Sequence, residues 1–264
     1  MWTLDRSAAV PAWRPATADP TCVRAFSTRM GGVSAPPCDT LNLGLSCGDR
    51  QEDVLANRVR LLESLDLGPA DLATAGQVHG TSIRSVSGPG HEPGCDALLT
   101  LTPGLALAVA TADCMSLLYS TADAVAAAHV GWRGAAAGLP AGTLRALCAA
   151  AAVPPGAVRV ALGPCIRACC YEVGPDVAAH FPPATVRTVG ARLHLDLPAV
   201  ARLQLLEAGL PPAALEDIGV CTACERESCF SHRRDAGRTG RLWGLVSLRP
   251  GAHRSPGRGT GPPV

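Results

Sequence analysis

Apolar and polar positions divide the chain into many short apolar runs and a few longer segments with helical spacing. Between residues 52 and 65, the apolar side chains Val54, Leu55, Val59, Leu61 and Leu62 recur at a spacing typical of an amphipathic helix. Acidic residues stand in its first turn, where the helix dipole favours them. Further helices are predicted over residues 141–152, which end before two prolines, and over 175–181 and 198–208.

Brief apolar runs bounded by Gly, Pro or Asp predict buried strands. They cover residues 22–26, 72–78, 81–86, 97–101, 105–110, 116–119, 124–130, 158–162 and 242–248. Strands with interspersed helices and no internal repeat predict an α+β fold, a single domain over residues 21–249. Residues 1–20, rich in Pro and Ala, are expected to form a loose arm. Residues 250–264, dominated by Pro, Gly, Arg and Ser, are expected to be a disordered tail.

Charge and composition narrow the classes of function. The 23 basic and 22 acidic residues nearly cancel, which gives no electrostatic case for nucleic acid as a partner. Every basic residue is Arg, so Schiff-base chemistry on Lys is excluded. The start of the chain lacks the apolar core of a secretory signal, and no apolar run approaches the roughly 20 residues of a membrane helix. We therefore expect a cytoplasmic protein that binds no membrane, as a monomer or homodimer, whose 12 cysteines are free thiols or metal ligands.

Three segments, residues 77–80, 112–114 and 128–134, each join an apolar strand to a sharp polar turn. They carry His79, Cys114 and His129. Strand ends can bring distant residues together, and two imidazoles with one thiolate form a three-ligand set of catalytic zinc sites, which leaves the fourth position open. Their spacings match no short metal motif, so structural roles stay open from the local sequence alone. Arg133, in the last of these turns, indicates either an anion site or an ordinary turn with a solvated side chain.

A series of ordered motifs adds a family resemblance that spans nearly the whole chain. The motifs are residues 26–34, 41–44, 48–49, 57–58, 77–80, 112–114, 129–134, 163–166, 171–174, 221–222, 230–235 and 239–241. With these motifs the sequence resembles the laccase-domain (polyphenol oxidase-like) family. The resemblance implies a laccase-domain, cysteine-hydrolase-like fold of mixed sheets flanked by helices. It also implies phosphorolysis of purine nucleosides such as adenosine, inosine, guanosine and methylthioadenosine to base and ribose-1-phosphate, with adenosine deamination as a second activity.

The same resemblance implies roles for individual residues. His79, Cys114 and His129 would bind Zn²⁺, and Asp113 would transfer a proton or act as a turn-forming residue. Substrate contacts are expected from residues in the matched segments, with Arg29 and Arg133 the first choices for phosphate; the remaining candidates are Asn42, Gln77 and Arg234. Aromatic residues are only 3% of the chain, and Phe230 is the candidate for stacking on the purine.

Three alternative functions use the same residues differently. A copper-dependent polyphenol oxidase is an older assignment for the family, but two His and one Cys are too few ligands for a multicopper cluster. A cysteine hydrolase would use Cys114 as a thiolate nucleophile activated by His129 or His79. A non-catalytic scaffold predicts a degraded site, whereas the three ligand positions are intact.

The remaining cysteines raise the question of a second metal. Cys221, Cys224, Cys229 and His232 follow a C-x2-C-x4-C-x2-H spacing, which is compatible with a zinc knuckle. The resemblance favours free thiols here instead. Cys165, Cys169 and Cys170 are likewise predicted to be buried or free thiols beside a turn.

Overall fold

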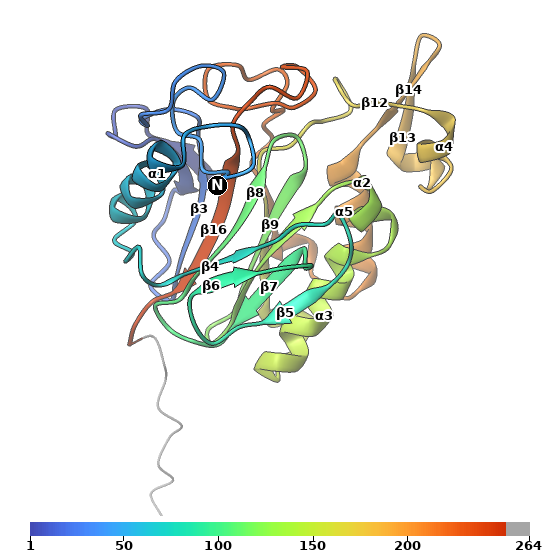
Figure 1. Ribbon diagram of the computed structural model, residues 1–264. Helices are drawn as coiled ribbons and strands as arrows, with labels where there is room; N and C mark the ends of the chain where they lie inside the picture. Colours follow the sequence, from blue (N-terminus) through green and yellow to red (C-terminus); the bar gives the residue numbers. More distant parts are fainter. Residues whose placement is uncertain (252–264) are drawn as a thin grey trace, which may run out of the picture.

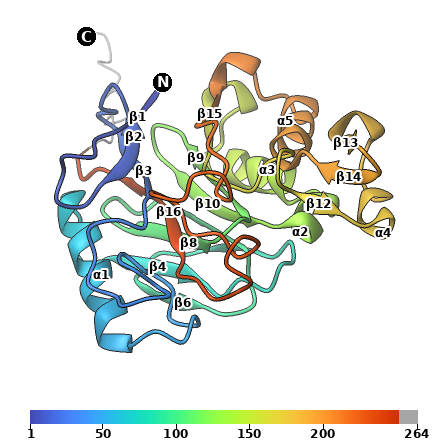
Figure 2. The same ribbon diagram turned by 90° about the horizontal axis from the view of Figure 1, so that it is seen from above.

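Two large β-sheets face one another, and helices cover their outer surfaces (Figures 1 and 2). The computed structural model describes residues 1–251. The resulting four layers (helix, sheet, sheet, helices) confirm the α+β class and its mixed sheets in one domain. No helix within residues 1–251 is long and apolar enough to cross a membrane.

The first sheet has seven strands and carries one long helix. In spatial order its strands are β1 (Trp2–Leu4), β2 (Ala12–Pro15), β3 (Cys22–Ser27), β16 (Leu242–Leu248), β8 (Ala106–Thr111), β4 (Leu72–Ala75) and β6 (Gly90–Glu92). Helix α1 (Gln51–Ser64) lies on its outer face, where Leu61 and Leu62 pack with Trp243 and Leu245. This helix matches the predicted one to within a residue, because its apolar stripe is what the sheet buries.

The second sheet has six strands and carries the other long helices. In spatial order its strands are β15 (Leu215–Asp217), β11 (Arg159–Leu162), β9 (Met115–Ser120), β10 (Val125–Val130), β7 (Ala97–Thr100) and β5 (Ile83–Ser85). Helices α2 (Trp132–Ala136), α3 (Leu139–Ala151) and α5 (Leu197–Glu207) cover its outer face.

A small third sheet stands beside the main layers. It contains β12 (Glu172–Val173), β14 (Arg192–Leu195) and β13 (Val186–Val189), next to α4 (Pro175–Ala178). Single turns of 3₁₀ helix occur at η1 (Pro155–Ala157), η2 (Pro183–Thr185) and η3 (Pro212–Ala214). The helix predicted over residues 175–181 is shorter than expected, because α4 ends at Ala178.

Burial on both faces explains why the central strands are continuous apolar runs. In β10, Ala126, Ala128 and Val130 face the helices, while Val125 and Ala127 face the other sheet. Every residue of β9 and β10 is buried. A strand covered on both sides needs apolar residues at each position rather than an alternation.

Two expectations from the sequence need correction. Residues 1–20 do not form a loose arm: β1 and β2 pair antiparallel, and β2 pairs with β3. Trp13 and Val10 are buried there, and the pairing satisfies backbone groups that β3 would otherwise expose at the sheet edge. The strands predicted over residues 72–78 and 81–86 are shorter than expected, since residues 76–82 form a loop between β4 and β5. The predicted disordered tail lies almost entirely outside the described residues.

The interface between the sheets generates the first prediction. Leu118 is fully buried on the face of β9 that meets the seven-stranded sheet. We expect Leu118→Ala to lower the free energy of unfolding by about 2–5 kcal/mol, because it removes buried methyl groups and leaves a cavity. Leu55, 45% exposed on α1, is the matched control. Leu55→Ala should change stability by no more than about 0.5 kcal/mol. Denaturant unfolding measures both, and equal losses would contradict the assignment of this core.

Candidate functional site

His79, Cys114 and His129 come together although 50 residues separate the first from the last. Their donor atoms all lie within 4.8 Å of one another. The Cys114 Sγ and the His79 Nε2 are 3.9 Å apart. The two imidazole rings stand nearly perpendicular, with an interplanar angle of 85°. His79 is exposed, Cys114 half-buried and His129 buried, so the cluster opens to solvent on one side.

Each of the three residues is placed by the end of a strand. His79 lies in the loop after β4, Cys114 in the turn between β8 and β9, and His129 near the end of β10. Strands β4 and β8 are parallel neighbours, so the segments that follow them leave the sheet at the same edge. In the antiparallel pair β9–β10, His129 is opposite Ser116, two residues after Cys114. The sequence-based idea that strand ends assemble these residues therefore agrees with the geometry.

The carboxylate of Asp96 holds two of the ligands in position. Asp96 is fully buried just before β7. It accepts hydrogen bonds from the backbone N–H groups of Val78 (3.2 Å), His79 (2.9 Å) and Gly80 (2.7 Å). The His129 Nδ1 donates to the same carboxylate at 2.9 Å, which leaves Nε2 as the donor available to the cluster. Such a carboxylate–histidine pair is typical of metal sites, where it fixes the tautomer and orientation of the ring.

Sequence reasoning missed Asp96. The available signal was an acidic residue directly before an apolar strand, at residues 97–100, in a position that the fold buries. Burial by itself raises the pKa of Asp96. Hydrogen bonds from His129, Gly80 and His79 outweigh that effect and lower the pKa, so the side chain is a carboxylate.

The cluster also shifts the protonation of its own members. Burial raises the pKa of the Cys114 thiol, but hydrogen bonds from His129 and His79 lower it to about 6. Burial lowers the pKa of His129, whereas its hydrogen bonds to Asp96 and Cys114 raise it to about 9. Without a metal the pair is therefore thiolate and imidazolium. A thiolate is the form of cysteine that binds metals and acts as a nucleophile.

Backbone strain is concentrated at this site. Gln77, His79 and Asp113 all adopt positive φ angles, of 51°, 61° and 88°. Residues other than glycine avoid this region, so such conformations are retained where the surroundings hold them in place. Gly131 leaves room for two ligands, since a Cβ there would stand 3.1 Å from the His79 ring and 3.2 Å from the Cys114 sulfur.

The three ligands line a cavity of about 810 Å³, within the range of small-molecule sites. Its walls come from both sheets, including residues 74–75 at the end of β4, and from loop residues that include 44–46, 76–77, 232–233 and 241. Besides the three clustered residues, the polar and aromatic side chains in the lining are Ser46, Arg58, Thr74, Gln77, His91, Thr111, Asp113, Tyr171, His232, Arg233, Arg241 and Trp243. Aliphatic contacts include Ile166 and Leu197.

Two of the predicted substrate-binding residues instead use their amides within the protein. The Gln77 side chain lines the cavity, but it donates to the Ala110 carbonyl and accepts from the Ala110 N–H. Asn42 is fully buried and is not part of the lining. Its amide bonds to Gly44, Asp49 and the backbone N–H of Arg241. Asn42 therefore shapes the loops around the cavity.

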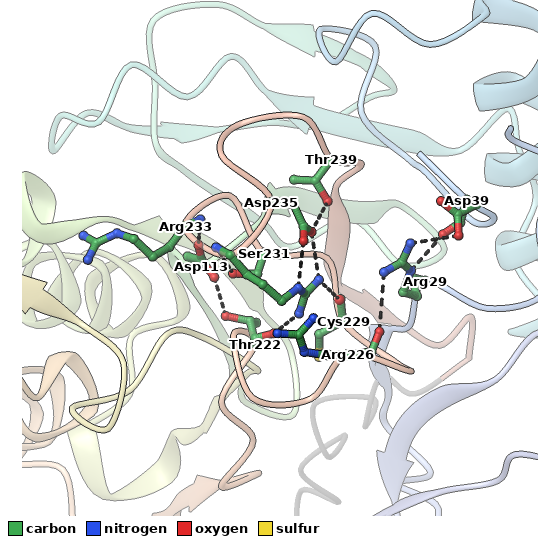
Figure 3. A network of polar contacts seen from close by, with 11 residues as sticks. Arg29, Asp39, Asp113, Thr222, Arg226, Cys229, Ser231, Arg233, Asp235 and Thr239 are labelled. Atoms are coloured by element: carbon green, nitrogen blue, oxygen red, sulfur yellow. Dashed lines mark hydrogen bonds and ion pairs between the residues drawn. The ribbon is translucent and has the colours of Figure 1, made fainter. Parts of the chain in front are cut away.

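The three predicted arginines are not brought together. Arg29 donates to the backbone and carboxylate of Asp39, away from Asp113, as Figure 3 shows. The side chain of Arg234 is 8% exposed and donates to the carbonyls of Thr222 and Cys229 and to Asp235. Arg133 is exposed on α2, with its guanidinium over the Trp132 ring. None of the three belongs to the cavity lining.

Arg233, the residue beside Arg234, lines the cavity, and its guanidinium donates to the Glu172 carbonyl at 2.9 Å. Its backbone N–H donates to the Asp113 Oδ2 at 2.6 Å, and the Thr222 hydroxyl donates to the other oxygen, Oδ1, at 2.6 Å (Figure 3). Asp113 thus ties the turn that carries Cys114 to the loop that carries Arg233. Its carboxylate is occupied by these contacts.

The aromatic contact in the cavity also differs from expectation. Phe230 is fully buried and packs under the Arg29 guanidinium, so the predicted stacking on a substrate is wrong. Tyr171 lines the cavity instead, with the Arg233 guanidinium 5.5 Å from its ring centre. Burial and the nearby Cys114 raise the pKa of Tyr171 to about 12, while Arg233 and Arg133 lower it.

The donor chemistry fits a bound metal ion. Two nitrogen donors and one thiolate converge, a buried carboxylate orients one imidazole, and the open side of the cluster faces the cavity. Three protein ligands with an open position are the pattern of catalytic rather than structural sites. Within residues 1–251, the other group of such donors contains cysteines alone.

Known sequences and structures resemble this chain over most of its length. The family model described as multi-copper polyphenol oxidoreductase laccase matches residues 23–249. A purine nucleoside phosphorylase of Deinococcus radiodurans is 42% identical over 234 residues, which cover 85% of this chain and 88% of the relative. The purine nucleoside phosphorylase YfiH of Escherichia coli is 36% identical, with coverage of 90% and 98%.

The fold is shared with solved structures. The crystal structure of YlmD from Geobacillus stearothermophilus matches with a TM-score of 0.87 and 34% identity, over 93% of this chain and 98% of that one. The Bacillus licheniformis hypothetical protein YfiH matches with a TM-score of 0.87 and 30% identity, over 93% and 99%. The family match and these shared folds span the same part of the chain as the ordered motifs found along the sequence.

Asp96 provides the prediction for this site. We expect Asp96→Asn to lower zinc affinity by about 10–100-fold, because the charge that orients His129 and holds the His79 loop is lost. Chelator competition on the purified protein measures the affinity. Asp66→Asn, at an exposed position, is the control and should leave the affinity unchanged. Equal zinc affinity in Asp96→Asn and the wild type, with the fold retained, would show that Asp96 does not support the site.

Proposed function

This chain belongs to the multi-copper polyphenol oxidoreductase laccase family, and we propose that it is a zinc-dependent purine nucleoside phosphorylase. Its substrates would be adenosine, inosine, guanosine and methylthioadenosine, with adenosine deamination as a second activity. The observation that carries the proposal is the His79, Cys114 and His129 cluster at the wall of a nucleoside-sized cavity, in a chain 42% identical to a protein named purine nucleoside phosphorylase.

The three ligands would hold Zn²⁺, which supplies a Lewis acid beside the substrate. In phosphorolysis, an oxygen of phosphate forms a bond to C1′ of the ribose as the bond from C1′ to the purine nitrogen breaks. The purine leaves with the bonding electron pair and takes up a proton. Positive charge develops on the ribose meanwhile, so an anion held close to C1′ stabilises the transition state.

Arg233 and Arg133 are the proposed phosphate ligands. Arg233 lines the cavity, and Arg133 lies two residues after Gly131, which also lines it. A guanidinium pairs well with a phosphate because its N–H groups match the oxygens in pairs. Arg29 and Arg234, with their N–H groups bonded inside the protein, contribute by holding loops.

Asp113 and Gln77 fit positioning roles better than direct chemistry. Both carboxylate oxygens of Asp113 accept short hydrogen bonds, from Thr222 and from the backbone of Arg233. The Gln77 amide pairs with Ala110 on both sides. These contacts stabilise positive-φ residues next to the ligands, so that the ligands and Arg233 stay in register.

A cysteine hydrolase is the second candidate, and the low pKa of Cys114 beside a protonated His129 favours it. A copper polyphenol oxidase has less support. Within the described residues, the cluster with histidine donors provides three ligands, whereas a multicopper centre needs several such sites.

His79 tests the proposal directly. We expect His79→Ala to lose zinc and the phosphate-dependent release of hypoxanthine from inosine, because two donors remain for the ion. Metal analysis and the assay are run on the same preparation, with circular dichroism as the check on folding. His180→Ala, an exposed histidine outside the cavity, should keep both properties.

Chelation separates the candidates. A zinc phosphorylase loses activity in chelator and regains it with added zinc, whereas a cysteine hydrolase survives chelation and is inactivated by alkylation. Full phosphorolysis by His79→Ala, or by chelated wild type, would refute the zinc mechanism.

Arg233 tests the phosphate site. We expect Arg233→Gln to raise KM for phosphate about tenfold or more, since a charged hydrogen bond contributes about 1.5–3 kcal/mol and about 1.4 kcal/mol is tenfold. KM for inosine should change much less. Arg192→Gln, on the exposed side of β14, is the control. An unchanged KM for phosphate in Arg233→Gln would place the anion elsewhere.

A further inference from the structure

Four cysteines from two distant segments converge outside the catalytic cluster. Cys169 and Cys170 follow β11, and Cys221 and Cys224 follow β15. All four sulfur atoms lie within 4.8 Å of one another. The Cys224 sulfur is 3.4 Å from that of Cys170 and 3.7 Å from that of Cys169. All four cysteines are free thiols.

The fold aligns the two segments before the cysteines are reached. Strands β11 and β15 are parallel neighbours, and a parallel bridge between Cys165 and Cys221 continues their pairing. The Thr222 N–H donates to the Cys165 carbonyl at 3.0 Å. Arg167 and Asp217 form an ion pair across the same segments. Each of the two segments then makes a tight turn, at residues 167–170 and at residues 221–225, and the two turns lie side by side.

We propose that Cys169, Cys170, Cys221 and Cys224 bind a second zinc ion as a closed, structural tetrathiolate site. Zinc–thiolate bonds of about 2.3 Å in a tetrahedron place the sulfur atoms about 3.8 Å apart, close to the separations observed. Adjacent Cys169 and Cys170 can both contribute, because consecutive Cα atoms are also about 3.8 Å apart. The C-x2-C spacing of Cys221 and Cys224 is that of zinc turns.

The donor set favours one soft ion over other occupants. Thiolates select zinc and iron over hard cations. Four sulfur atoms within 4.8 Å enclose a single ion, whereas an iron–sulfur cluster holds its cysteines further apart around several irons.

The proposed ligands differ from the zinc knuckle that the spacing of Cys221, Cys224, Cys229 and His232 suggested. Cys229 is fully buried in the core between the sheets, and burial raises its pKa to about 12. His232 lines the main cavity. The first half of the pattern, Cys221 and Cys224, is therefore completed by Cys169 and Cys170 from another part of the chain.

This second ion would join two loops of the main cavity. Tyr171 follows Cys170 directly, and Thr222, between Cys221 and Cys224, donates to Asp113 next to Cys114. Arg234 also donates to the Thr222 carbonyl. The tetrathiolate ion therefore holds together the segments that bring Tyr171 and Arg233 to the substrate.

The test uses a protein that keeps the four cysteines and lacks the other site. In His79→Ala/His129→Ala, purified under reducing conditions without chelator, we expect one zinc per chain with four sulfur neighbours at about 2.3 Å by X-ray absorption. Replacing zinc by Co²⁺ should give the intense thiolate-to-metal absorption of a tetrathiolate centre. Wild type should hold two zinc ions per chain.

Cysteine variants in the same background identify the ligands. Cys170→Ser/Cys224→Ser should abolish the Co²⁺ tetrathiolate spectrum. Cys148→Ser, a half-buried thiol on α3 outside the cluster, should leave the spectrum unchanged. The proposal is overturned if the His79→Ala/His129→Ala protein carries no metal, if its zinc has nitrogen or oxygen neighbours, or if freshly isolated chains contain a disulfide among these cysteines instead.

Discussion

The buried carboxylate of Asp96 is the interaction on which the site depends. It lies at the start of a strand of the six-stranded sheet and accepts the amides of a loop that leaves the seven-stranded sheet. A buried charge without partners is strongly destabilising. Asp96 is satisfied only when the His79 loop and the His129 ring are both in place. The Asp96 carboxylate has all its partners only after the two sheets have docked and the cluster has assembled. Docking of the sheets and assembly of the cluster are therefore parts of one process.

The strained residues beside His79 and Cys114 also depend on polar contacts within the protein. Positive φ angles at Gln77 and Asp113 each cost about 1–3 kcal/mol. In both cases the side chain of the strained residue makes hydrogen bonds that hold the turn: Gln77 to Ala110, and Asp113 to Thr222 and Arg233. The polar residues beside the ligands thus serve mainly to keep an unfavourable backbone in shape. This explains why several residues of the family motifs lie at the cavity without offering free polar groups to a ligand.

Local sequence patterns predicted much of the fold. The elements that they missed depend on pairing between residues far apart in the sequence. Residues 52–65 and 242–248 were predicted closely, because their periodicity reflects a face that must be buried. The strands of residues 1–20 were missed, since their pairing with β3 depends on a sheet edge that no local pattern describes. Among site residues, turns at strand ends made the convergence of His79, Cys114 and His129 plausible, and the family resemblance singled these three out. Asp96 and the four-cysteine cluster were missed, because each is defined by partners far away in sequence.

The two clusters of potential metal donors differ in their donor atoms and in their surroundings. Cys114 shares its cluster with two imidazoles, and one side of that cluster faces the cavity. The second cluster has four thiols, so a zinc ion there would have its coordination completed by the protein. Thr222 and Asp113 connect the two by a 2.6 Å hydrogen bond. A closed site needs no substrate to be complete. Under the proposed function, such a site would hold the loops of the open site in place while the open site exchanges its ligands.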